Sequence, residues 1–152
     1  MIILPGSLYY GASQVIPQVL QSINKSLIQG GYNLMIANLD RDEISERHIL
    51  DLAFGGSVRG AIILSSKLPE VDGRSPANSG LPIVSMLLDM SDAGLQSVVT
   101  NDREAVRDVT AELIRLGHRR FFYLAGPEGN YHDVERYAGV LAQLLPRARL
   151  VH

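Results

Sequence analysis

The sequence predicts an α/β fold built on a doubly wound parallel sheet. Short apolar runs, typical of buried strands, alternate along the chain with longer stretches that repeat apolar residues at helical spacing. The connections between these stretches are mostly a few residues long and rich in Gly, Pro, Asn and Asp. Strands and helices that alternate through short connections form parallel sheets with right-handed crossovers.

Strands and helices alternate regularly through residues 1–100. We expect strands at residues 2–4, 32–37, 61–64, 83–88 and 97–100. The first helix should begin near Pro17, because proline is tolerated only in the first helical turn, and should end at Gly30-Gly31. The second helix should be capped by Asp40 or Asp42 and should end at Gly55-Gly56.

The remaining residues continue the alternation. Asn101-Asp102 should cap a helix that Gly117 ends, because glycine adopts the positive φ of a helix stop. The nearly all-apolar run Phe121 to Ala125 predicts a strand covered on both faces, and Gly126-Pro127 ends it. A further helix should begin at Asp133. Residues 148–151 should begin one more strand.

Composition excludes several classes of protein. The chain has 152 residues and no cysteine, so disulfides, thiol catalysis and cysteine metal sites are excluded. No apolar run reaches the length of a membrane span, and Met1 to Pro5 lacks the basic region of a signal peptide, so we expect a cytoplasmic protein. The formal net charge of −2 argues against binding of nucleic acid by these 152 residues alone.

No catalytic pattern is visible, and we expect neither enzymatic activity nor a metal or cofactor. The phosphate-binding and dinucleotide-binding glycine motifs are absent, and so is the Gly-x-Ser-x-Gly motif of hydrolases. The histidines are scattered, and none forms a pair at metal-ligand spacing. Surface positions are expected for His48, His118, His132 and His152.

The stretch Leu116 to Pro127 reads L-G-H-R-R-F-F-Y-L-A-G-P, and it resembles the L-G-H-R-R-I-x-x-L-x-G-P segment of LacI/GalR-type transcription regulators. Further pieces resemble the same family in the same order. They lie at residues 31–34, 37–42, 58–66, 81–84 and 135–139. Each piece is weak alone, but their order and spacing extend the resemblance over essentially the whole chain.

The resemblance implies a two-lobed effector-binding domain with the fold of periplasmic binding proteins. Residues 1–100 would form the first lobe, and residues 101–152 would begin a truncated second lobe. The family's helix-turn-helix headpiece is absent from this sequence, and the family's effector domain continues well beyond His152, so we expect the chain to be a fragment. Operator DNA would be bound only through the absent headpiece.

The resemblance also implies a set of ligand-binding residues. Asp89 would accept hydrogen bonds from sugar hydroxyls, or it could be a turn-forming aspartate that bonds its own backbone. Arg136 would bind effector oxygens with its planar fork of donors, or it could be a solvated helix residue. The other candidates are loop residues after strands: Gly6, Ser7, Tyr10, Ser65 and Ser66. Tyr10 lies near the place of the family's Asn-Pro-Phe-Phe pattern, which this sequence lacks.

The function that follows from the resemblance is effector sensing in a LacI-type regulator. A small polar ligand of the sugar or nucleoside class would bind between the lobes and change their relative angle. We expect a homodimer, with its first-lobe contact near the helix from Ile16 to Ile28. Two alternatives remain, a periplasmic-type solute-binding protein for sugar transport and an enzyme on a flavodoxin-like domain, because fold alone does not decide between them.

Overall fold

The structure is a computed structural model that describes residues 1–5, 15–40, 42–65, 67–126 and 128–145. The chain divides into two compact units, Met1–Val99 and Thr100–His152, which we call unit 1 and unit 2. The strand predicted at residues 148–151 lies outside the described residues.

Unit 1 is built on a parallel sheet, which confirms the predicted α/β class. Its strands are β1 (Ile2–Leu4), β2 (Ile36–Asn38), β3 (Ala61–Ile63), β4 (Ile83–Met86) and β5 (Gln96–Val98). They lie in the order β2-β1-β3-β4-β5, and every neighbouring pair is parallel. β1 lies between β2 and β3, and its Ile3 is paired with Ala37 on one side and Ile63 on the other. Short 3-10 helices, η1 (Pro76–Asn78) and η2 (Ser91–Ala93), lie in the connections on either side of β4.

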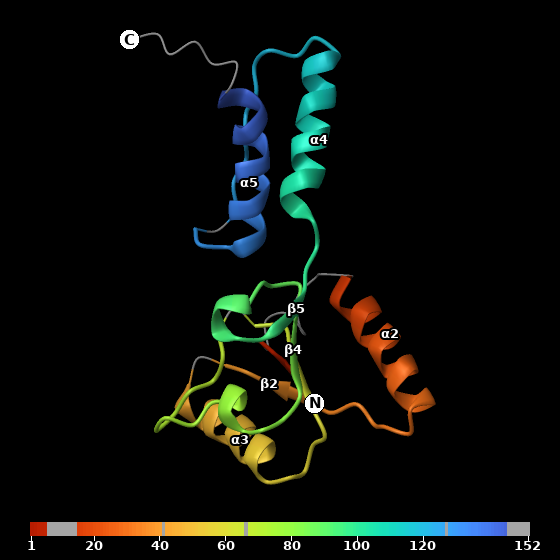
Figure 1. Cartoon of the computed structure of the whole chain (residues 1–152), viewed down its shortest axis with the longest axis vertical. Helices are drawn as coiled ribbons and strands as arrows, with labels where there is room; N and C mark the ends of the chain where they lie inside the picture. Colours follow the sequence, from red (N-terminus) through yellow and green to blue (C-terminus); the bar gives the residue numbers. More distant parts are fainter. Residues whose placement is uncertain (6–14, 41, 66, 127, 146–152) are drawn as a thin grey trace. The chain divides into compact units, whose positions relative to one another are not determined.

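Two helices cover opposite faces of this sheet, as Figure 1 shows: α2 (Val15–Gln29) and α3 (Glu43–Phe54). Alternate residues of β1 divide the core between them, because successive side chains of a strand point to opposite faces. Ile2 and Leu4 belong to the same apolar cluster as Ile16 of α2. Ile3 points the other way and belongs to a cluster with Ile49 of α3. β1 is therefore buried on both faces.

The predicted helix boundaries in unit 1 are confirmed. Pro17 is the third residue of α2, where its missing N–H costs nothing, and Gly31 follows the helix at a φ of 77°. Asp42 caps α3, and its carboxylate accepts a hydrogen bond of 2.8 Å from the backbone N–H of Ser45. The helix ends at Phe54, and Gly55 follows as its C-cap.

Unit 2 contains α4 (Asp102–Arg115) and α5 (Tyr131–Leu144), which pack against each other. A Cβ atom at Gly139 of α5 would collide with the carbonyl oxygen of Arg103 and would lie 3.0 Å from the amide nitrogen of Arg107. The close approach of the two helices therefore requires glycine at this position. Gly117 ends α4 as predicted, with a φ of 99°. His118 then donates its backbone N–H to the carbonyl of Leu113 at 3.1 Å.

The strand predicted at residues 121–125 is not formed. The segment is extended, but it has no strand neighbour within the described part of the chain. Phe121 and Tyr123 are half-buried, whereas Phe122 and Leu124 on the other side are 91% and 86% exposed. The segment has the alternating sides of a strand without the backbone hydrogen bonds that would make it one.

Candidate functional site

The described candidates of unit 1, Ser65 and Asp89, both lie at the carboxyl end of the sheet. Ser65 comes shortly after β3, and Asp89 comes shortly after β4, the neighbouring strand. Open α/β sheets bind ligands outside the carboxyl ends of their strands. Gly6, Ser7, Tyr10 and Ser66 lie outside the described residues.

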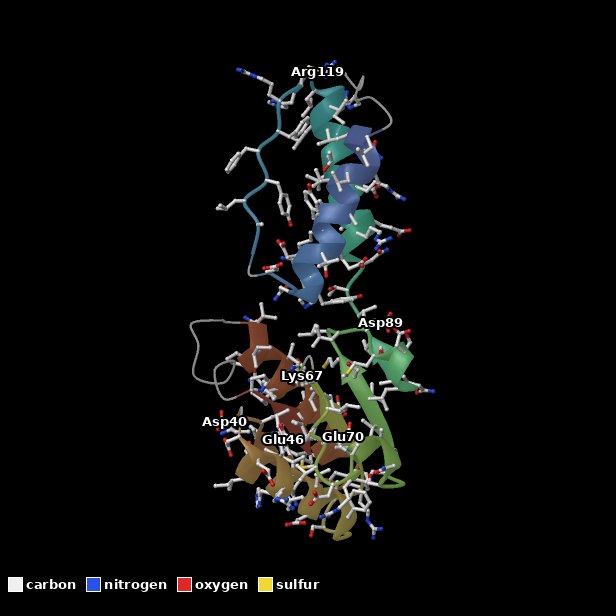
Figure 2. The ribbon with its side chains drawn as sticks, turned by 90° about the vertical axis from the view of Figure 1, so that its left-hand side faces the viewer. Asp40, Glu46, Lys67, Glu70, Asp89 and Arg119 are labelled. Atoms are coloured by element: carbon white, nitrogen blue, oxygen red, sulfur yellow. The ribbon has the colours of Figure 1, made fainter. Side chains whose placement is uncertain are left out.

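The two side chains differ in their surroundings. The Ser65 side chain is buried, and its hydroxyl accepts a hydrogen bond of 3.3 Å from the backbone N–H of Lys67. Asp89 is exposed at the outer surface of unit 1 (Figure 2). Its Oδ1 accepts the backbone N–H of Ser91 at 3.0 Å, the local bond of a turn-forming aspartate. This backbone bond, together with the Ser91 hydroxyl, lowers the pKa of the Asp89 carboxyl.

The turn that carries Asp89 has an unusual backbone. Leu87 has a φ of 71°, a conformation that leucine rarely adopts. Two hydrogen bonds hold it: its N–H donates to the carbonyl of Val98 at 2.7 Å, and the buried Ser85 hydroxyl donates to the carbonyl of Leu88 at 2.6 Å. The backbone before Asp89 is thus fixed by these two hydrogen bonds in a strained conformation, and this fixes the position of Asp89.

Arg136 lies on α5 in unit 2 and is part of a cluster centred on Asp102. The Asp102 side chain is 8% exposed. Its Oδ1 accepts a hydrogen bond of 2.8 Å from Nε of Arg136. Its Oδ2 lies 2.6 Å from the Thr100 hydroxyl and 2.7 Å from Nδ1 of His132. The Arg136 guanidinium is therefore partly bound within unit 2: its Nε is held by Asp102, and half of the side chain is exposed to solvent.

These contacts keep Asp102 ionised. Burial by itself raises the pKa of the Asp102 carboxyl, but the hydrogen bonds from Thr100, His132 and Arg136, with the charge of Arg136, outweigh burial and lower the pKa from 3.8 to about 2. The carboxylate is thus a permanent acceptor at neutral pH. Its three donors come from the residues before α4 and from the first two turns of α5.

Sequence reasoning missed this cluster. Asp102 was expected to cap a helix, but it lies inside the first turn of α4, and Asn101 is the N-cap without a capping hydrogen bond from its side chain. His132 was expected at the surface, and its side chain is only 26% exposed. The available signal was the spacing of His132 and Arg136, which places both side chains on one face of a helix.

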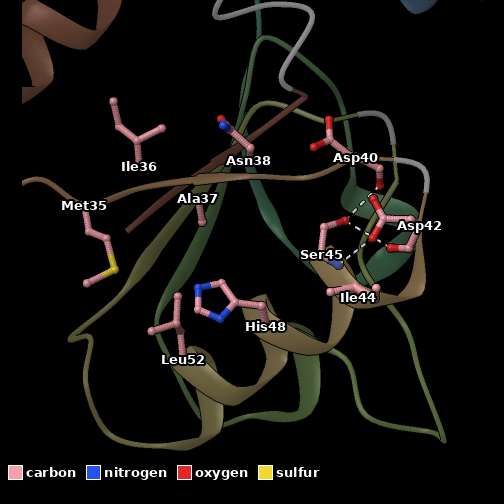
Figure 3. Close-up of a pocket in the computed structure, with 10 residues that line it drawn as sticks. All are labelled: Met35, Ile36, Ala37, Asn38, Asp40, Asp42, Ile44, Ser45, His48 and Leu52. Atoms are coloured by element: carbon pink, nitrogen blue, oxygen red, sulfur yellow. Dashed lines mark hydrogen bonds between the residues drawn. The ribbon is translucent and has the colours of Figure 1, made fainter.

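A separate groove of about 580 Å³ lies in unit 1 between β2 and α3 (Figure 3). His48 and Leu52 of α3 line one side, and Met35 and Ala37 line the other. None of the predicted site residues lines this groove. Among the described residues, no group of three or more His, Asp or Glu side chains could hold a metal ion. No described helix is both long and apolar enough to span a membrane.

No protein-family model matches the chain. Catabolite control protein A from Staphylococcus aureus strain MRSA252 is 25% identical over 141 residues, which cover 91% of this chain and 41% of that protein. Catabolite control protein A from Priestia megaterium is 27% identical over 95 residues, which cover 62% of this chain and 29% of that protein. The chain therefore spans less than half the length of these curated relatives.

Solved structures show the same fold. The transcription regulator CcpA of Lactococcus lactis has a TM-score of 0.73 at 24% identity, over 96% of this chain and 52% of that one. A LacI family regulator from Lactobacillus casei with bound sucrose has a TM-score of 0.71 at 24% identity, over 99% of this chain and 54% of that one. The Cra regulator from Pseudomonas putida, in complex with fructose 1-phosphate, has a TM-score of 0.74 at 23% identity, over 97% of this chain and 53% of that one.

The chain is thus similar in sequence to catabolite control protein A and in fold to solved transcription regulators. More specifically, its fold is that of the effector-binding domain of LacI-type regulators, which resembles a periplasmic binding protein.

Proposed function

We propose that this chain senses a small polar effector, of the sugar or nucleoside class, as part of the effector-binding domain of a LacI-type regulator. The observation that carries the proposal is the similarity to catabolite control protein A over 91% of the chain, which includes residues of both units. Residues 1–100 act as the first lobe, and residues 101–152 act as the beginning of the second.

In this proposal the ligand is held by hydrogen bonds from both lobes. Asp89 accepts from ligand hydroxyls with its exposed carboxylate, while Oδ1 keeps its bond to the backbone N–H of Ser91. Arg136 donates from its terminal nitrogens, while its Nε remains bound to Asp102. The loop residues Gly6, Ser7, Tyr10, Ser65 and Ser66 line the first lobe's side of the site.

The effector acts by binding more tightly to one arrangement of the lobes than to the other. In a homodimer, that preference changes how two DNA-binding headpieces meet the operator. Sensing of this kind requires no catalysis and no cofactor, and it takes place in the cytoplasm. The relatives favour this function over transport, because those named for a function are regulators.

The proposal is tested by calorimetric titration of the chain with sucrose, D-fructose, D-ribose, adenosine and fructose 1-phosphate. We expect at least one compound to bind, and we expect Asp89→Asn to weaken that binding roughly tenfold, because a hydrogen bond to a charged group is lost. Asp92→Asn is the matched control, since Asp92 is also exposed and lies three residues away in η2. Failure of every compound to bind contradicts the proposal.

A further inference from the structure

Two serines on neighbouring strands of unit 1 bind the backbone on either side of Asp89. Ser85 of β4 is paired with Ser97 of β5, so both side chains lie on the same face of the sheet. The Ser85 hydroxyl donates to the carbonyl of Leu88 at 2.6 Å. The Ser97 hydroxyl oxygen accepts the backbone N–H of Met90 at 2.9 Å. The serine pair therefore holds the residue immediately before the carboxylate and the residue immediately after it.

The side chains near Asp89 are anchored on opposite faces of the sheet. Alternation along a strand would place Leu87 on the opposite face from Met86, but both pack against the apolar cluster that contains Ile16 of α2. Met90 packs against the other cluster, which contains Ile49 of α3. The chain makes this change of face through the positive φ of Leu87, 71°.

The conformation of this turn needs support from outside its own backbone. A positive φ is unfavourable for leucine, and such a residue persists only where its surroundings hold it. Ser85 is fully buried and Ser97 is half-buried, so water competes little for the Ser85 hydroxyl. A buried hydroxyl that lost its partner would cost free energy, which favours the bent turn over a relaxed one.

We infer that Ser85 and Ser97 are positioning residues for the contact between Asp89 and the effector. Together they hold the turn in the conformation that presents the carboxylate, so that binding does not have to order the turn. This inference rests on the proposed function and adds to it the residues that prearrange its site. Neither serine touches the ligand, and both act through the backbone beside Asp89.

The first test needs no ligand and uses NMR of the chain. In Ser85→Ala and in Ser97→Val, the coupling between the amide and α protons of Leu87 should show that φ has left the positive region. The N–H of Ser91 lowers the pKa of the Asp89 carboxyl, and that bond depends on the shape of the turn. The pKa of Asp89 should therefore rise toward that of an ordinary aspartate in both variants.

The second test measures affinity by calorimetry, with whichever of sucrose, D-fructose, D-ribose, adenosine and fructose 1-phosphate binds the unmodified chain most tightly. Ser85→Ala and Ser97→Val should each weaken that compound roughly threefold to tenfold, the worth of one hydrogen bond. Ser97→Thr resembles Ser97→Val in shape but keeps a hydroxyl that can accept, so it should bind nearly as well as the unmodified chain.

Ser79→Ala is the matched control for Ser85→Ala. The Ser79 hydroxyl also donates at 2.6 Å to a backbone carbonyl three residues away, that of Pro76, but it does so in η1. Its removal should leave the affinity, the φ of Leu87 and the pKa of Asp89 unchanged. An equal loss of affinity in Ser79→Ala and Ser85→Ala would mean that general destabilisation is the cause, and it overturns the inference.

The outcomes separate this inference from the proposed function. If the compound binds Ser85→Ala and Ser97→Val as tightly as the unmodified chain, the inference is wrong and the proposed function stands. Equal losses in Ser97→Thr and Ser97→Val have the same meaning, because size rather than the hydroxyl would then be the cause. If no compound binds, the proposed function fails and the inference fails with it. Where circular dichroism shows that Ser85→Ala has not folded, the comparison of Ser97→Val with Ser97→Thr decides.

Discussion

Removing the negative charge of Asp102 should destabilise unit 2 by an amount that depends on pH. The carboxyl has a pKa of about 2 in the folded chain against 3.8 for an ordinary aspartate. A tenfold difference in proton affinity is worth about 1.36 kcal/mol, so the contacts of Asp102 contribute about 2 kcal/mol at neutral pH. Asp102→Asn keeps the size of the side chain and should lose that amount.

The direction of the pH dependence follows from the lowered pKa. A group with a lower pKa in the folded state stabilises fully above its unfolded pKa, and the stabilisation disappears as pH falls through the folded pKa. The difference between the unmodified chain and Asp102→Asn should therefore be complete above about pH 5. It should fall to roughly half near pH 3 and vanish below pH 2.

Hydrogen exchange of the backbone amides in α4 and α5 is the suitable assay, because it reports the free energy of opening for unit 2 alone. Asp108→Asn is the matched control on the same helix. Its exposed pair with Arg107, at 3.1 Å, should contribute less than about 0.5 kcal/mol at either pH. An Asp102→Asn effect that is equal at pH 7 and pH 3, or no larger than the control, would refute the reasoning.

Three further results are expected. Gly139→Ala should lower the free energy of unfolding in urea by about 1–3 kcal/mol or more, because the new Cβ would meet backbone atoms of α4. Gly126→Ala is the control and should have a small effect, because its nearest neighbours are atoms of the Asp133 side chain at 3.5 Å. The chain should associate at micromolar concentration, as measured by light scattering. Phe122→Lys should reduce the apparent mass, since Phe122 is 91% exposed on a segment without a strand neighbour among the described residues. A monomeric mass for the unmodified chain would argue against association. A gel-shift titration at physiological salt should show no sequence-specific retention of duplex DNA, given the formal net charge of −2.

The features that could be predicted from sequence are those that local chemistry determines. Pro17 limits where α2 begins, and Gly31 and Gly117 end helices through a positive φ that other residues avoid. The run Phe121 to Ala125 shows the limit of this reasoning. Its composition is that of a buried strand, but a strand also needs backbone partners, and none of the described residues supplies them.

The Asp102 cluster could not be predicted for a related reason, since its contacts join residues that are 30 and 34 positions apart. Those contacts depend on how closely α5 approaches α4, and the approach depends on a missing side chain at Gly139. A buried carboxylate is costly unless donors surround it. Here the helix packing brings His132 and Arg136 to Asp102, while Thr100 is supplied locally. The residue that makes the cluster possible thus lies outside it, and a bulkier residue at position 139 should disturb His132 and Arg136 without touching either.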